Sequence, residues 1–255
     1  LSYRWGVASI VLIVFGWLSG CNFRLAGKDW GVVFLLSLLR AVTSFSLIIA
    51  YQNIASGVAS TIHFMYPLAV ALAMMFFFRE KKSLLVILAV LMSLLGAALL
   101  SLGELEAKSG NTMVGLVAAC VSVFSYAGYI VGVRTTRAVQ INSTALTCYV
   151  MGLGTIFYLI GAYCTSGLQL VSDGYTWLII LGLALPATAI SNITLVQAIK
   201  YAGPTLTSIL GAMEPLTAVV IGVFVFKELF TVNSAVGIIL ILLAVSIVVF
   251  RRQKS

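Results

Sequence analysis

The stretch His63-Phe-Met-Tyr-Pro67 lies in a long apolar segment that ends in Phe78-Arg-Glu80. A second stretch, Gly211-Ala-Met-Glu-Pro215, leads in the same way to Phe226-Lys-Glu228. The two prolines are 148 residues apart, and so are the two closing glutamates. Identity at a fixed offset is typical of repeat architectures, so we interpret the two stretches as copies of one unit.

The repeat extends beyond these motifs. Eight of the thirty-one positions from 50 to 80 are identical to those from 198 to 228, without a gap. The identical positions include the prolines and glutamates that punctuate the segment. The offset of 148 can therefore be used to align the rest of the chain.

Composition places the chain in a membrane. Hydrophobic residues make up 62% of the 255 residues and charged residues 9%, whereas a soluble globular domain carries roughly 25% charged residues. Apolar runs of about 20 residues are long enough to span a bilayer as helices. Strand-like alternation, which an outer-membrane barrel would show, is absent. We expect an all-α polytopic membrane protein.

Nine spans can be drawn, and the connections between them are too short for a soluble domain. They cover residues 3–18, 31–51, 57–78, 83–102, 113–133, 144–164, 175–200, 204–226 and 234–250.

Charges indicate the orientation, because positive residues favour the cytoplasmic side of short loops. Eleven positive residues fall on one side, and only Arg4, Lys108 and Lys227 fall on the other. The eleven are Arg24, Lys28, Arg79, Lys81, Lys82, Arg134, Arg137, Lys200, Arg251, Arg252 and Lys254. This split predicts a cytoplasmic C-terminus in an inner or plasma membrane. The charges lie in short clusters between apolar runs, which does not favour nucleic acid as a partner.

The offset predicts the architecture. Subtracting 148 maps the sixth to ninth spans onto the first to fourth, while the fifth, 113–133, maps to a position before residue 1. We therefore expect a ten-helix plan whose first helix is missing here. A repeat of five helices is odd in number, so its two copies, 1–102 and 113–250, must be inverted. Inverted repeats are a recurring plan of secondary transporters.

These stretches resemble the drug/metabolite transporter superfamily, and in particular its EamA-like branch. The residues that carry the resemblance are Ser60-Thr-Ile-His-Phe-Met-Tyr-Pro67 with Phe78-Arg-Glu80, and Thr207-Ser-Ile-Leu-Gly-Ala-Met-Glu-Pro215 with Phe226-Lys-Glu228. The resemblance implies ten spans with both ends in the cytoplasm. It also implies export or exchange of small metabolites, amino acids or toxic compounds without ATP.

Ionisable residues inside a span cost about 2.5–3.5 kcal/mol on insertion scales, so they usually face a cavity or a partner. Arg40 lies about nine residues into its span and Glu214 about ten, which places both roughly 15 Å deep. Arg40 is a candidate contact for an anionic substrate group, and Glu214 is a candidate carrier of a coupling proton. A structural Arg–Glu pair, or an Arg40 side chain that snorkels, is the alternative.

His63, the single histidine, is a candidate proton relay because imidazole titrates near neutral pH. A packing residue held by a hydrogen bond is the alternative. Tyr66 and His63 oppose Glu214 and Gly211 in the repeat alignment. These asymmetric positions are candidates for substrate and coupling chemistry.

Other polar residues share helical faces. Thr188 and Asn192 are four residues apart, and the offset pairs them with Arg40 and Ser44. Asn192 is a candidate neutral substrate contact, and an interhelical hydrogen bond is the alternative. Tyr126 and Tyr129 also share a face, where they either line a cavity or pack.

The repeated motif residues have a structural interpretation. Pro67 and Pro215 would each bend a helix, as a gating hinge or as a fixed kink. Glu80 and Glu228 lie at span ends, where they would hold the start of the following helix.

The sequence favours a secondary transporter that exports or exchanges small organic metabolites or toxic compounds by alternating access between the two inverted repeats. The alternatives are a membrane-embedded enzyme and a non-transporting membrane partner. An enzyme would need a nucleophile–base or metal constellation, for which the sequence offers few residues. No cofactor is expected, because the chain has no phosphate loop of the GxxxxGK[ST] type and no CxxC pair.

Overall fold

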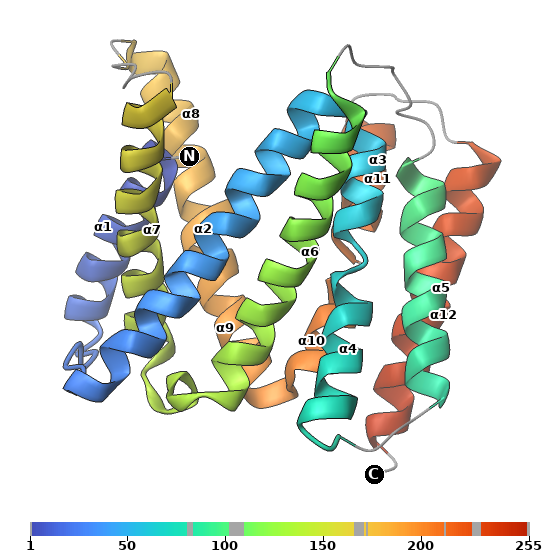
Figure 1. Ribbon diagram of the computed structural model, residues 1–255, viewed down its shortest axis with the longest axis horizontal. Helices are drawn as coiled ribbons and strands as arrows, with labels where there is room; N and C mark the ends of the chain where they lie inside the picture. The colour runs from blue at the N-terminus through green and yellow to red at the C-terminus, as the bar shows by residue number, and fades with distance from the viewer. Residues whose placement is uncertain are drawn as a thin grey trace. The chain divides into compact units, whose positions relative to one another are not determined.

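This computed structural model describes residues 2–80, 84–101, 110–165, 171, 173–211, 213–225 and 231–253. Within these ranges the regular structure is helical and contains no strand. In chain order the helical elements are α1 (Ser2–Leu18), η1 (Gly27–Asp29), α2 (Trp30–Asn53), α3 (Ser56–His63), α4 (Tyr66–Phe77), α5 (Leu84–Ser101), α6 (Thr112–Thr135), η3 (Arg137–Gln140), α7 (Ser143–Thr165), α8 (Gly174–Ala184), η4 (Leu185–Ile190), α9 (Ser191–Ala202), α10 (Pro204–Leu210), α11 (Met213–Val225) and α12 (Val232–Gln253) (Figure 1).

The helices have the length and composition of membrane spans, which confirms the predicted polytopic membrane protein. In the described part of the chain, five segments are long and apolar enough to cross a bilayer: 27–53, 56–77, 112–135, 143–163 and 174–202. Shorter apolar helices occur at Ser2–Leu18, Leu84–Leu99 and Ala235–Ile247.

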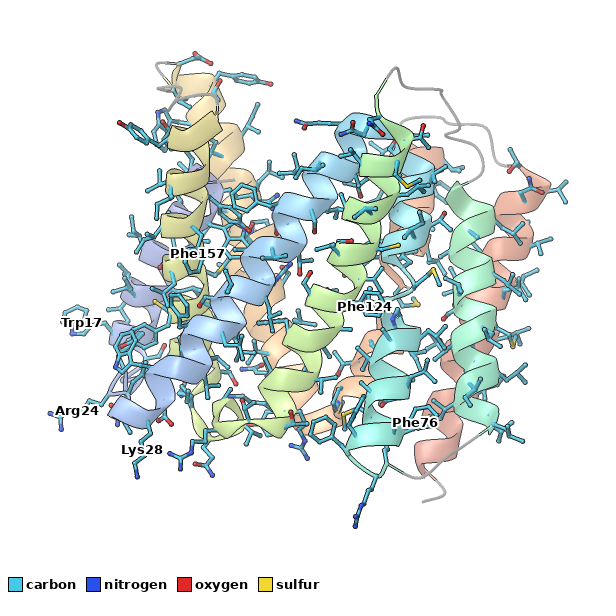
Figure 2. The ribbon with its side chains drawn as sticks, in the orientation of Figure 1. Trp17, Arg24, Lys28, Phe76, Phe124 and Phe157 are labelled. Atoms are coloured by element: carbon cyan, nitrogen blue, oxygen red, sulfur yellow. The ribbon has the colours of Figure 1, made fainter. Side chains whose placement is uncertain are left out.

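Large apolar side chains lie on the outside of this helical protein. Trp17, Phe76 and Phe124 are 77%, 67% and 71% exposed. Trp17, for example, points away from the helices (Figure 2). In water such a surface would favour aggregation, whereas in a bilayer it contacts acyl chains.

The proline-containing spans are interrupted rather than bent. The third predicted span consists of α3 and α4, with a turn at Phe64 and Met65. The eighth consists of α10 and α11, with a turn at Gly211. The helices that precede the two breaks, α3 and α10, begin 148 residues apart, like the motifs. Pro67 and Pro215 fall in the first turns of α4 and α11, where a missing N–H costs no helical hydrogen bond.

The seventh predicted span also departs from a regular helix. It consists of α8, the π-helical turn η4 and α9. Pro186 occupies the start of the π turn, where a wider turn accommodates its ring and its missing donor.

Contacts divide the chain into two compact units. Unit 1 contains residues 1–41 and 132–202, and unit 2 contains 42–131 and 203–255. Each unit thus combines segments from both predicted repeats. The repeat boundaries, 1–102 and 113–250, and the inversion of the two copies stay predictions.

In unit 1, α1 packs antiparallel to α7. Ser9 Oγ donates to the carbonyl of Cys148 at 3.3 Å. An ideal Cβ at Gly154 would lie 2.5 Å from a ring carbon of Trp5, so only glycine lets the indole lie this close to α7. This contact fixes the position of Trp5.

In unit 2, α5 and α12 run side by side (Figure 1). An ideal Cβ at Gly96 of α5 would lie 2.7 Å from the carbonyl oxygen of Gly237 in α12, so the two backbones approach closely. Small residues at membrane helix interfaces allow this approach. A core of Ala71, Met75, Ala89, Val90, Ile209 and Ala244 joins these helices to α4 and α10.

Arg4, Arg134 and Lys200, which we counted as loop charges, lie within helices. They belong to α1, α6 and α9. Arg134 Nη1 donates to the Lys200 carbonyl at 2.6 Å, and Lys200 Nζ donates to the Ile141 carbonyl. These bonds tie the end of α9 to the segment between α6 and α7.

Candidate functional site

Two polar clusters stand out, one in each unit. The first surrounds Arg40, which lies in the middle of α2 and is half-buried. Arg40 Nη2 donates to Asn192 Oδ1 at 3.4 Å. Its guanidinium carbon lies 5.6 Å from the centroid of the Trp5 ring, within the range of a cation–π interaction. The structure thus brings together two residues that sequence analysis had singled out separately.

The π turn orients Asn192 toward Arg40. Asn192 Nδ2 donates to the carbonyl of Thr188 at 2.7 Å, which leaves Oδ1 for the guanidinium. Thr188 Oγ1 donates to the Leu183 carbonyl, five residues earlier, at 3.0 Å. Both side chains are buried. Thr188 therefore acts on this cluster through its carbonyl, while its hydroxyl donates to a backbone carbonyl of the same span.

Sequence analysis missed Arg4 and Trp5 as members of this cluster. Trp5 is 2% exposed, and its ring meets the Tyr158 ring edge-on at 5.0 Å. Arg4, next to Trp5, is half-buried, and the charge of Arg40 acts on it. The available signal was an arginine inside an apolar run beside a tryptophan, which we assigned to a loop.

The second cluster, in unit 2, is aromatic. It contains His63 at the end of α3, Tyr66 at the start of α4, and Tyr126 and Tyr129 of α6. The His63 ring stacks on Tyr126 at 5.5 Å between centroids, and Tyr66 meets Tyr126 edge-on at 4.7 Å. Tyr126 and Tyr129 are parallel, 6.4 Å apart. All four members were candidates from sequence.

His63 also has a defined hydrogen bond to α6. Its Nδ1 lies 2.9 Å from Ser122 Oγ. The Ser122 hydroxyl donates its single proton to the Ala119 carbonyl at 2.6 Å, so Ser122 accepts from His63. The network therefore assigns a proton to Nδ1. A histidine held in one tautomer can exchange a proton at Nε2.

The interruption between α10 and α11 adjoins the aromatic cluster. An ideal Cβ at Gly211 would lie 1.8 Å from the Tyr66 hydroxyl oxygen. Residue 211 must therefore be glycine while Tyr66 keeps this position. The repeat partner of Gly211 is His63, so the glycine of one copy and the histidine of the other both contact Tyr66.

Glu214 lies in the first turn of α11 and is exposed. A carboxylate at this place is stabilised by the positive end of the helix dipole. Arg40 belongs to unit 1 and Glu214 to unit 2, so the Arg40–Glu214 pair stays a prediction.

Of the two motif glutamates, Glu80 has a contact that sequence did not foretell. Glu80 follows α4 and accepts a hydrogen bond from Thr205 Oγ1, in the first turn of α10, at 2.6 Å. It thus contacts a helix from the other copy of the repeat. Glu228 lies outside the described residues.

Comparison with known protein families identifies the family of this chain. The model of the EamA-like transporter family matches residues 1–102 and 113–250. The chain belongs to the EamA-like transporter family. The resemblance inferred from the proline-to-glutamate motifs is thereby confirmed.

Relatives of this EamA-like protein agree with that assignment. An uncharacterized transporter of Archaeoglobus fulgidus is 28% identical over 238 residues, which cover 92% of this chain and 83% of that protein. A protein known from a crystal structure matches with a TM-score of 0.83 at 18% identity, over 100% of this chain and 88% of that one. The latter shows a shared fold. The protein is a membrane transporter that sits in a lipid bilayer and binds small molecules.

Proposed function

We propose that this EamA-like protein is a secondary transporter that exports or exchanges a small organic solute by alternating access. The observation that carries the proposal is the pair of interrupted helices, α3/α4 and α10/α11, at equivalent positions of the two copies. Irregular backbone at membrane depth is tolerated where it is buried in protein or lines a water-filled cavity. Discontinuous helices of this kind form the substrate sites of many secondary transporters.

The bodies that move in this proposal are the two units rather than the two repeats. Each unit has its own packed interior, whereas each repeat is divided between both units. A body moves as one piece when its internal contacts exceed those that cross its boundary. Distance measurements between labels placed within one unit should stay constant during transport.

Transport is tested with the purified chain in proteoliposomes. Succinate, alanine and ethidium, all radiolabelled, serve as an anion, a zwitterion and a cation. Saturable uptake of at least one of them, faster after preloading with the unlabelled compound, is expected of an exporter or exchanger. A chain that moves none of the three above protein-free liposomes would contradict the proposal.

We further propose that Glu214 couples transport to protons. In Glu214→Gln, uptake driven by an imposed pH gradient should fall at least tenfold, while exchange at equal pH on both sides continues. Glu80→Gln is the matched control, because Glu80 is another exposed carboxylate of unit 2. Equal gradient-driven uptake by Glu214→Gln and the wild type would show that another group carries the proton.

The orientation belongs to the same proposal. The distribution of positive residues supports a cytoplasmic C-terminus in an inner or plasma membrane. A single cysteine added after Ser255, in a cysteine-free background, should be labelled by a membrane-impermeant maleimide only after the cells are opened. Labelling in intact cells would reverse the topology.

A further inference from the structure

Unit 1 carries two arginines within its helices. Arg4 lies in the first turn of α1 and Arg40 in the middle of α2, and both are half-buried. Trp5, adjacent to Arg4, lies against the Arg40 guanidinium, and the charge of Arg40 acts on Arg4. Two like charges repel each other more strongly at the low effective dielectric of such a site than in water.

The two arginines differ in their contacts. Trp5 contacts Arg40 through its ring, and Asn192 accepts one hydrogen bond from it. Arg4 Nε is fully buried and has no hydrogen-bond partner among the described residues. A buried donor in this condition costs free energy that a suitable acceptor would recover.

The acidic side chains of unit 1 lie elsewhere within its described residues. Asp29 belongs to η1, eleven residues before Arg40, which is about 16 Å along the helix axis. Asp173 caps α8, where its carboxylate accepts two hydrogen bonds from Thr176. Asp173 is thus engaged at the start of α8, and neither carboxylate is bonded to Arg4 Nε.

We propose that Arg4 and Arg40 form a binding site for the carboxylate or phosphate group of a small soluble anion. The guanidinium fork matches both groups with paired N–H donors. Such forks favour an anion over a neutral or cationic solute, because a guanidinium keeps its positive charge. This inference rests on the proposed transport function and narrows its substrates to organic acids and phosphate esters.

The test measures thermal stabilisation of the purified full chain, since a ligand that binds the folded state raises the melting temperature. Sodium succinate and sodium phosphate are compared with sodium chloride at equal ionic strength. We expect at least one of the two anions to raise the melting temperature by about 5 °C at roughly 100 times its Kd. Neither anion exceeding chloride would overturn the inference.

Variants locate the site. Arg4→Gln and Arg40→Gln should each abolish the shift, while Arg4→Lys and Arg40→Lys, which keep the charge and lose the fork, should reduce it. Arg24→Gln is the matched control, because Arg24 is exposed and points away from the helices (Figure 2). A shift that persists in both glutamine variants would place the anion elsewhere and overturn the assignment.

A lipid headgroup offers the same phosphate chemistry, so one arm replaces the soluble anion with phosphatidylglycerol in the detergent micelles. Stabilisation by phosphatidylglycerol alone would overturn the assignment to a soluble anion. The flux assay separates this inference from the transport proposal. Uptake of alanine or ethidium without anion binding would leave transport standing and the inference wrong. Anion binding without flux of any probe would leave the inference standing and the transport proposal wrong.

Discussion

The hydroxyl oxygen of Tyr66 occupies the place of a side chain at Gly211: an ideal Cβ there would lie 1.8 Å from it and 3.1 Å from the ring carbon that bears it. Tyr66 opens α4, and Gly211 follows α10. The two interrupted helices of unit 2 therefore meet through one tyrosine and one missing side chain. Since the repeat alignment pairs Tyr66 with Glu214 and Gly211 with His63, this contact exists only because the two copies differ.

Gly211→Ala should destabilise the protein by about 1–3 kcal/mol, the usual cost of overpacking. The added methyl must displace the Tyr66 hydroxyl. Tyr66→Phe removes that oxygen, so the double variant should be more stable than the sum of the single changes predicts. The measurement is a double-mutant cycle on thermal unfolding in detergent.

Gly182→Ala is the control for this cycle. Gly182 lies inside α8, and a Cβ there meets nothing within 4 Å. A cost at Gly182 as large as that at Gly211 would show that the Tyr66 contact is not the cause.

Gly203→Ala should cost about 1–3 kcal/mol for a different reason. Gly203 has φ 88° and ψ 158°, a conformation nearly exclusive to glycine, and a Cβ there meets no neighbour. Backbone strain alone is therefore responsible, and no second-site change of a neighbour should relieve it. A stability equal to that of the wild type would contradict the backbone conformation at the start of α10.

Ser122→Ala should destabilise the protein by about 1–3 kcal/mol, because it leaves the Nδ1–H of His63 without its acceptor. Ser46→Ala is the matched control. Ser46 is also buried in unit 2, but its hydroxyl bonds only to carbonyls of its own helix, those of Val42 and Thr43. Equal effects of the two serine variants would assign the cost to the helix rather than to His63.

Asp173 should make the stability of α8 depend on acid pH. Hydrogen bonds from the Thr176 backbone N–H and hydroxyl lower the pKa of the Asp173 carboxyl. A lowered folded-state pKa gives stabilisation that is present above the unfolded value, about 3.9, and is lost as the pH falls through the folded value.

Asp173→Asn tests this, because asparagine accepts the same bonds at every pH. The melting temperature of the wild type minus that of the variant should decrease as the pH is lowered from about 6 to about 2. A difference independent of pH would exclude the cap as the titrating group.

Much of the fold could be predicted from apolar run lengths, because bilayer thickness dictates the length of a span. The interruptions could not be placed. Proline marked the right segments, but α3 ends at His63, ahead of Pro67, because the proline is accommodated in the first turn of a new helix. The π turn that contains Pro186 could not be placed either, because a proline in the sequence does not distinguish a kink from a π turn.

The candidate site was predictable where single residues broke an apolar pattern. His63, Tyr66, Tyr126 and Tyr129 gather because α3, α4 and α6 belong to one unit. Arg4 was missed because its position near the start of a span resembles a loop charge. The assignment of Arg4 to a loop is wrong because α1 includes it and Trp5 packs against a glycine of α7. A single sequence does not reveal such a contact.

The break at Phe64 and Met65 also determines how the protein fits membranes of different thickness. Unbroken α6 has 24 residues and is about 36 Å long, so it fits a hydrocarbon core of about 30 Å only by tilting as a rod or by placing its ends among the headgroups. The α3/α4 span is built from pieces of 8 and 12 residues. Such a span can adjust its height by changing the angle between its pieces, and hydrophobic mismatch would then be absorbed beside Tyr66 rather than at the lipid interface.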